Sequence, residues 1–399
     1  MQHFSYFSEQ DQEALFMKRP ENIDVNSHKK LIASGLGASL YSPATRPTLA
    51  QDVLKNARRG VASAILCLED SIPDDKVEEA QENLTKALAE LSAIEDKSEF
   101  PLLFIRIRNP EHLALVAEQN EPYLDLLTGF VLPKFEDLSG AGTEYLQNLR
   151  YINSILRVGQ GKRPLYFMPV LESPQLVYRE TRTAVLNGVR DLLAENRDAT
   201  LAVRIGATDM GSPFGLRRSR DLTIYDVHVV SSAIADIVNT FGRASKEGFV
   251  ITGAVWEHFT DRERLFKPRL RQSPFADDNE TRKLRNKLIL EDLDGLIREV
   301  ELDRANGLLG KTVIHPLHVA LVNSMSVVSH EEYSDALDII NASEGGTGAR
   351  ASVYRNKMNE QKPHYAWAKK TMWRASAFGV ANEGVTFVEL LEAAMKTYV

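Results

Sequence analysis

The stretches Val-Leu-Glu-Ser-Pro (170–174) and Arg-Ile-Gly-Ala-Thr-Asp (204–209) each place an acid directly after a short apolar run. A third stretch, Phe-Ile-Arg-Ile-Arg (104–108), ends its apolar run on arginine. Runs of this length are typical of strands that are buried on both faces in a parallel sheet. Because α/β barrels gather the carboxyl ends of their strands at one face, these stretches predict a barrel with acids and arginine at that face.

Eight segments of the chain share this strand-like character, and helical or irregular stretches separate them. Alternation of strands and helices indicates a parallel sheet, and eight strands favour closure into a (β/α)8, or TIM, barrel. The alternative is an open sheet that binds a dinucleotide, but no Gly-x-Gly-x-x-Gly follows the first strand. The predicted strands are Ser39–Pro43, Ala62–Leu68, Pro101–Ile107, Gly129–Lys134, Leu165–Leu171, Thr200–Ile205, Gly248–Val255 and Gly310–Ile314.

The barrel accounts for only part of the 399 residues, so the sequence also predicts extensions at both ends. We expect an N-terminal extension over 1–37, the barrel as catalytic domain over 38–330, and a C-terminal helical extension or lid over 331–399. The last of these is longer than the final helix of a barrel requires.

Four further features are predicted outside the strands. The connection 256–309 is long and charged, and we expect a loop over the barrel mouth followed by a helix over 282–304. Ser173 and Pro174 are a good N-cap and first-turn residue for a single helix whose apolar stripe runs to Leu192. The glycine-rich stretch 343–348 predicts a flexible joint, and 387–398 predicts an amphipathic final helix.

Composition excludes several classes of function. Hydrophobic residues make up 43% of the chain and charged residues 26%, which is ordinary for a globular protein. A formal charge of −7 argues against binding nucleic acid, which needs a basic surface. The single cysteine, Cys67, leaves no disulfide within the chain and fits a reducing cytoplasm. We expect neither a signal peptide nor a membrane span, because no apolar stretch approaches about 20 residues.

Nearly every predicted strand ends on a polar or ionisable side chain. Some of these residues have simple structural explanations: Glu172 suits the N-terminus of a helix, and Asp209 suits a turn. Arg106 and Lys134 could neutralise neighbouring acids in a ring of ion pairs, and a histidine before proline is often a hydrogen-bonded loop residue. The whole set favours a shared site more strongly than any member does, and it comprises Arg46, Glu69, Asp70, Arg106, Lys134, Glu172, Asp209, Trp256 and His315.

The chemistry of this set favours a hard cation. Mg²⁺ commonly takes one or two protein carboxylates and completes its shell with water and substrate oxygens, and Glu172 and Asp209 would supply such a pair. A bound Mg²⁺ polarises a carbonyl, and an adjacent arginine such as Arg106 stabilises the developing negative charge. This combination suits cleavage or formation of a C–C bond beside a carbonyl. Zinc is disfavoured because the nine histidines show no metal-ligand spacing.

Seven motifs in order resemble one known family, the citrate lyase beta subunit and malyl-CoA lyase family of Mg²⁺-dependent C–C bond lyases of the TIM-barrel fold. The resemblance extends from Ser39 to Pro316, and the large loop and tail suggest an enlarged bacterial subgroup. The motifs are Leu-Tyr-Ser-Pro-Ala-Thr-Arg-Pro (40–47), Cys-Leu-Glu-Asp (67–70), Phe-Ile-Arg-Ile (104–107), Val-Leu-Pro-Lys (131–134), Leu-Glu-Ser-Pro (171–174), Gly-Ala-Thr-Asp (206–209) and Gly-Lys-Thr-Val-Ile-His-Pro (310–316).

The resemblance implies roles for particular residues. Mg²⁺ would lie on Glu172 and Asp209. The residues expected in catalysis are Arg106, Glu69, Asp70 and Lys134, and those expected to bind substrate are Arg46, Arg106, Thr208 and His315. Arg46 lies where the family often contacts a phosphate of CoA or of an acyl carrier. The expected substrate is a small carboxylate or keto acid, free or as a CoA or acyl-carrier thioester, and the expected assembly is a homotrimer or homohexamer.

The sequence departs from the family pattern at two positions beside the expected site. Cys67 lies where the family usually has aspartate, and Arg108 lies where a small polar residue is usual. Both departures concern the side of the site that would choose the substrate.

Three hypotheses follow. The first is a lyase that acts through a metal-stabilised enolate, with a general base that is either a metal-bound hydroxide or an acid from a neighbouring subunit. The second is a catalytically altered, lyase-like protein that binds a small carboxylate without chemistry. The third, less favoured by the ordered motifs, is a phosphoenolpyruvate-type barrel enzyme.

Overall fold

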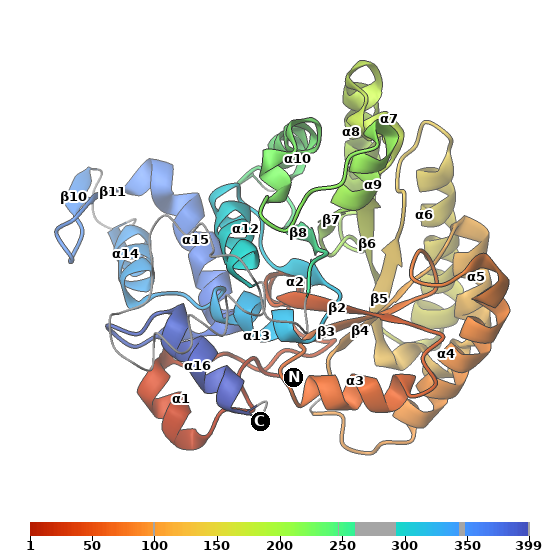
Figure 1. Cartoon of the computed structure of the whole chain (residues 1–399), viewed down its shortest axis with the longest axis horizontal. Helices are drawn as coiled ribbons and strands as arrows, with labels where there is room; N and C mark the ends of the chain where they lie inside the picture. Colours follow the sequence, from red (N-terminus) through yellow and green to blue (C-terminus); the bar gives the residue numbers. More distant parts are fainter. Residues whose placement is uncertain (99, 246, 260–292, 343–347, 398–399) are drawn as a thin grey trace.

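Eight parallel strands form a closed barrel, which confirms the predicted (β/α)8 fold (Figure 1). The structure is a computed structural model of the whole chain, and it describes residues 1–98, 100–245, 247–259, 293–342 and 348–397. All eight predicted strands are present within a few residues of their expected bounds. In order around the barrel they are β2 Ala38–Pro43, β3 Ser63–Cys67, β4 Leu102–Arg106, β5 Leu127–Leu132, β6 Tyr166–Leu171, β7 Val203–Ile205, β8 Ile251–Trp256 and β9 Lys311–Val313.

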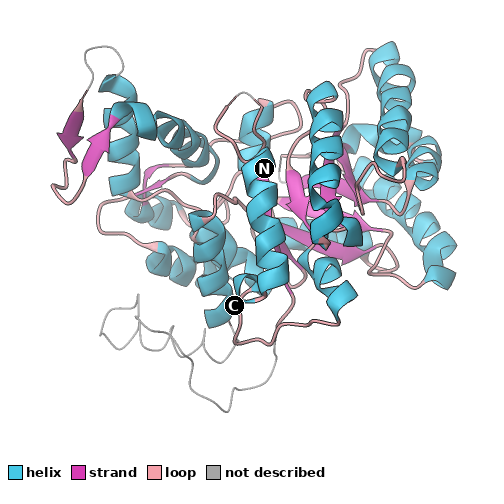
Figure 2. Cartoon of the chain, turned by 90° about the horizontal axis from the view of Figure 1, so that it is seen from above, coloured by secondary structure: helices cyan, strands magenta, loops and turns pink. Residues whose placement is uncertain are grey.

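Pairing in the barrel follows the chain, and β2 closes it by pairing with β9. The strands are almost wholly buried because helices cover their outer faces, which explains why their sequences are continuously apolar. Helices surround the strands in both views (Figure 2). The covering helices are α3 Leu49–Ala57, α4 Val77–Ser92, α5 Pro110–Gln119, α6 Ala141–Tyr151, α7 Pro174–Val177, α8 Arg179–Glu195, α9 Ala207–Gly211, α10 His228–Phe241, α12 Asp294–Ala305 and α13 Leu317–Ser324.

The single helix predicted after β6 is wrong, because the chain forms two helices, α7 and α8. Tyr178 between them has extended backbone angles (φ −68°, ψ 128°). The guanidinium of Arg182 donates hydrogen bonds to the carbonyls of Leu176 and Val177, which satisfies the last carbonyl groups of α7 and stabilises the break. Ser173 precedes α7 as predicted, but its side chain makes no capping hydrogen bond.

The N-terminal and C-terminal segments pack against each other beside the barrel. Strand β1 (Phe16–Lys18) pairs antiparallel with β12 (Val380–Ala381), and Figure 1 shows α1 (Glu9–Leu15) beside α16 (Phe387–Thr397). Apolar side chains of both segments belong to the same core as the barrel. The remaining elements are α2 Lys29–Ser34, α14 His330–Asn341, β10 Ala349–Ala351, β11 Met358–Glu360 and α15 Gln361–Phe378.

Several predictions outside the barrel can be compared with these elements. Helix α12 contains most of the second half of the helix predicted over 282–304, and α16 matches the predicted final helix. The predicted loop over the mouth and the joint at 343–348 lie largely outside the described residues. The division at residues 37 and 330 stays a prediction. No helix in the described part of the chain is long and apolar enough to cross a membrane.

Candidate active site

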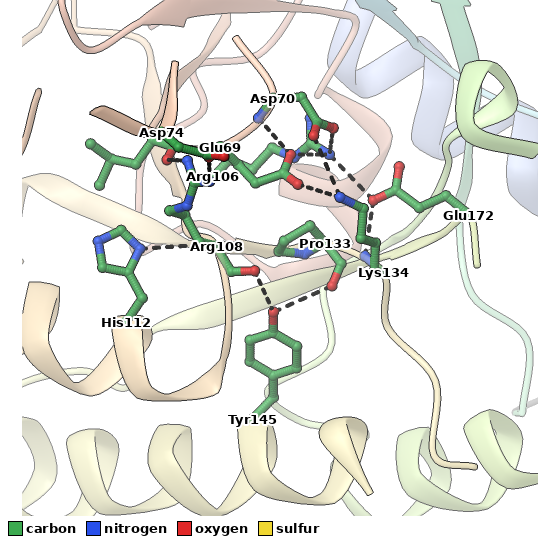
Figure 3. Close-up of polar contacts among 11 residues, drawn as sticks. Glu69, Asp70, Asp74, Arg106, Arg108, His112, Pro133, Lys134, Tyr145 and Glu172 are labelled. Carbon is green, nitrogen blue, oxygen red and sulfur yellow. Dashed lines mark hydrogen bonds and ion pairs between the residues drawn. The ribbon is translucent and has the colours of Figure 1, made fainter. Parts of the chain in front are cut away.

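Arg106 lies at the centre of a charged cluster at the carboxyl ends of β3 to β6 (Figure 3). One nitrogen of its guanidinium, Nη2, lies 2.8 Å from Glu69 Oε2, 3.0 Å from Asp70 Oδ2 and 3.2 Å from Glu172 Oε1. Only 11% of the Arg106 side chain is exposed, so these pairs are weakly screened by solvent. The parallel sheet thus brings together side chains from three separate strand ends, as the sequence predicted.

Lys134 follows β5 and joins the cluster from two directions. Its ammonium lies 2.8 Å from Glu69 Oε1, and its backbone N–H donates a 2.9 Å hydrogen bond to Glu172 Oε1. The backbone is left-handed here, with φ +49°, a conformation that costs free energy in a residue other than glycine. This turn lets one residue contact two acids, so Arg106 and Lys134 do form the ring of ion pairs that the sequence allowed.

Glu172 is the most deeply buried acid of the cluster, with 3% of its surface exposed. A Cβ on Gly206 would lie 2.0 Å from Glu172 Oε2, so this carboxylate fits only because position 206 has no side chain. Burial raises the pKa of Glu172 to about 8, with Asp209 acting in the same direction and Arg106 opposing both. A carboxyl in this state readily holds a proton or shares a cation with its neighbour.

Asp209 lies in the first turn of α9, directly after β7, and interacts with the Glu172 carboxyl. The two acids therefore form the adjacent pair that the sequence predicted on neighbouring strands. The described residues contain no group of three or more Asp, Glu, His or Cys side chains arranged to hold a metal. A pair of carboxylates is nevertheless the usual protein contribution to an Mg²⁺ site.

A cavity of about 600 Å³ opens beside the acid pair. Lys134, Glu172 and Asp209 are among its lining residues, as are residues at the first turns of α5, α6 and α7. Tyr145 and Tyr178 lie on its wall. This volume is within the range of small-molecule sites and exceeds what a small keto acid alone would fill.

Three predicted site residues belong neither to the lining of this cavity nor to the charged cluster around Arg106. Arg46 is half-exposed and pairs with Asp52 at 2.7 Å. The Thr208 hydroxyl donates a 2.9 Å hydrogen bond to Glu257. His315 stacks on Phe259, with ring centroids 4.9 Å apart, in the manner of an ordinary loop histidine.

The sequence model of one protein family, described as C-C bond lyases of the TIM-barrel fold, matches residues 30–380. The chain belongs to this family. The lyase is similar in fold to CitE from Mycobacterium tuberculosis, solved with magnesium, acetoacetate and coenzyme A, at 19% identity and a TM-score of 0.53, over 86% of this chain and 99% of that one. It is also similar to a citrate lyase from Burkholderia xenovorans LB400, at 16% identity and a TM-score of 0.58, over 91% and 96%. No curated protein matches its sequence.

Family membership makes the protein a carbon–carbon lyase, and two departures from the family motifs can now be placed in it. Arg108 of this lyase lines the cavity, but its guanidinium is held by Asp74 and by the carbonyl of Leu68 at 3.3 Å (Figure 3). Its backbone N–H donates to His112. Cys67 is fully buried on β3. Neither side chain adds an unpaired charge to the site of this lyase.

Sequence reasoning missed part of this lyase site. Gly206 is part of a motif, but the motif does not reveal that Glu172, at the end of the neighbouring strand β6, requires glycine at this position. Tyr145 and Tyr178 come from a helix and from a helix break, and no motif singled them out. The hydroxyl of Tyr145 donates to the carbonyls of Arg108 and Pro133, which fixes the ring against the cavity.

Proposed function

We propose that this lyase cleaves or forms a C–C bond beside a carboxylate or acyl thioester, through an enolate that develops next to Arg106. The observation that supports this most directly is the contact of one buried guanidinium with three acids at the strand ends, beside a cavity. An enolate oxygen that replaced one of these carboxylates would meet a preorganised positive charge.

The residues present fit Mg²⁺. Glu172 and Asp209 are hard oxygen donors, they lie next to each other, and the absence of a side chain at Gly206 lets the Glu172 carboxylate lie there. When bound there, Mg²⁺ would act as a Lewis acid on a substrate carbonyl. Glu69 and Asp70 hold Arg106 and Lys134 in place, so both cations are oriented before substrate arrives.

The substrate of this site is proposed to be a small carboxylate or keto acid, free or as a CoA or acyl-carrier thioester. The fold neighbour that contains acetoacetate and coenzyme A is compatible with either form. Arg46 could contact a phosphate group of CoA or of an acyl carrier only if its ion pair with Asp52 were broken. A cytoplasmic homotrimer or homohexamer is proposed on the resemblance alone, and light scattering would measure the assembly.

The proposal is tested first by metal binding. Calorimetry should detect Mg²⁺ binding to the wild-type protein, and Glu172→Gln or Asp209→Asn should weaken it tenfold or more, because each removes one charged ligand. Asp191→Asn is the matched control, since Asp191 is an exposed acid on α8 away from the cavity. Equal Mg²⁺ affinity in all four proteins would contradict the assignment of these acids.

Product analysis then separates a lyase from a binding protein. The protein is incubated with Mg²⁺ and a panel of hydroxy acids, keto acids and their CoA thioesters, and products are identified by mass spectrometry. Metal-dependent C–C cleavage or condensation that is lost in Glu172→Gln would support the proposal. Tight binding of these acids with no product would support the alternative, a carboxylate-binding protein that has lost the chemistry.

A further inference from the structure

Tyr41 is a half-buried residue of β2 whose ring lies between two arginines. The guanidinium carbon of Arg106 lies 5.9 Å from the ring centroid, and that of Arg204 lies 5.6 Å from it. No described residue forms a hydrogen bond with the Tyr41 hydroxyl. A phenol with a free hydroxyl therefore lies directly beside the guanidinium that we expect to stabilise the enolate.

Arg204 is an unusual neighbour because it is a fully buried cation inside the barrel. Its guanidinium donates to the hydroxyls of Ser39 at 3.3 Å and Thr312 at 2.5 Å and to the Met168 sulfur at 4.0 Å, and no described carboxylate pairs with it. A buried charge without a counter-charge is strongly unfavourable. Stacking on Tyr41 compensates part of this, and the barrel therefore maintains a positive charge next to this phenol.

The other ionisable groups of the cluster are already engaged. Glu69 and Asp70 pair with Arg106 and Lys134, and Glu172 with Asp209 is the proposed metal pair. Lys134 is a poor proton donor, because Glu69 and Asp70 raise its pKa against the effect of its burial. Among the described residues at this end of the barrel, Tyr41 combines a transferable proton, an unbonded hydroxyl and contact with Arg106.

We propose that Tyr41 is the catalytic acid that delivers a proton to the carbon of the enolate after C–C cleavage, and that Arg204 is a positioning residue for it. The inference rests on the proposed function. In the step, the C=C electron pair of the enolate takes the Tyr41 Oη proton and forms a C–H bond. The O–H electron pair stays on the phenolate oxygen, and the enolate oxygen regains its carbonyl double bond. Water then returns a proton to Tyr41.

The surroundings of Tyr41 suit this direction of transfer. Burial raises the pKa of its phenol and the charge of Glu172 and the Cys67 thiol act in the same direction, while Arg204 and Arg106 lower it. The net effect is upward, so the hydroxyl carries its proton at neutral pH. The two guanidinium groups stabilise the phenolate that exists after transfer.

The experiment measures the reverse of this step, which is exchange of carbon-bound hydrogen with solvent. Wild-type protein with Mg²⁺ is incubated in D₂O with pyruvate or with acetyl-CoA, and ¹H NMR follows loss of the methyl signal. Tyr41→Phe should slow exchange roughly 100-fold or more, the size expected for loss of one acid–base group. Its Mg²⁺ affinity and its circular dichroism should match wild type. Tyr166→Phe is the control, because Tyr166 begins β6 and so lies at the end of that strand away from Glu172; this variant should exchange at the wild-type rate.

Arg204→Met tests the positioning role through the pH profile of exchange. Removing this cation should move the rising limb of the profile to higher pH and lower the exchange rate at pH 7, with Mg²⁺ affinity unchanged. Exchange that is equally fast in wild type and Tyr41→Phe would overturn the inference while leaving the proposed function intact. Absence of exchange in wild type with both probes would overturn the proposed function and this inference together.

Discussion

Glu172 is the residue whose ionisation should control the stability of the metal-free protein. Its pKa rises from an ordinary 4.5 to about 8 on folding, chiefly through burial. The folded state therefore binds more protons than the unfolded state between these values, and stability falls as pH rises through that window, by up to about 1.4 kcal/mol per pH unit. Glu172→Gln mimics the protonated acid and should remove this contribution.

The measurement for this prediction is urea unfolding from pH 5 to pH 8 in the presence of EDTA. The free energy of unfolding of wild type, minus that of Glu172→Gln, should decrease as pH rises. The difference between the two proteins isolates Glu172 from other titrating groups. A difference that is constant over this range would show that Glu172 keeps an ordinary pKa in the folded protein.

Gly206 makes a second prediction at the residue scale. Gly206→Ala places a Cβ at the position of the Glu172 carboxylate, while the backbone at 206 (φ −103°, ψ 76°) is open to alanine. We expect Mg²⁺ affinity to fall tenfold or more, because the Glu172 carboxylate must turn away, and stability to fall as well, because the new Cβ would lie 2.6 Å from the Glu172 Cβ. Gly188→Ala is the control: its Cβ would meet only Asp137, at 3.7 Å, and alanine should stabilise α8 by about 0.5–1 kcal/mol. Equal loss of Mg²⁺ affinity in both variants would contradict this explanation.

At the scale of elements, buried ion pairs attach α12 to β9. Lys311 is almost fully buried, and its ammonium lies 2.7 Å from Asp303 and 2.9 Å from Glu299. Lys311→Met should cost about 3–5 kcal/mol in the free energy of unfolding, because it leaves the buried Asp303 without its cation, while Glu299 keeps only its pair with Arg218. Arg298 lies on the same helix, and Arg298→Ala, which breaks its exposed 3.5 Å pair with Asp226, should cost less than about 1 kcal/mol. Similar losses in urea unfolding would be evidence against this role for Lys311.

The same elements show what the sequence could and could not predict. Strands and their terminal acids were predictable, because apolar runs identify buried strands and parallel pairing aligns their ends. The break at Tyr178 was not, because it depends on where the Arg182 guanidinium lies in three dimensions. Nor were the partners of Tyr41, since Arg204 comes from a distant strand and contacts it only across the closed barrel. Side-chain contacts between elements need the geometry of the barrel itself.

For the whole molecule, the shared core of the barrel and the chain ends has a thermodynamic consequence. Leu391 of α16 is 1% exposed and belongs to the same apolar cluster as Trp256 of β8. We therefore expect one cooperative unfolding transition, in which Leu391→Ala costs about 2–5 kcal/mol. Trp367→Phe and Trp373→Phe would leave Trp256 as the only tryptophan and so as a fluorescence probe of the barrel.

In that background, Leu391→Ala should shift the Trp256 fluorescence transition and the circular dichroism transition to lower urea concentration by the same amount. The reason is that a cavity beneath α16 weakens every element that shares the core, including strand β8, which carries Trp256. An unshifted Trp256 transition with a separate early loss of helical signal would instead mean that the C-terminal segment folds as its own unit. The predicted boundary near residue 330 would then separate two units that unfold independently.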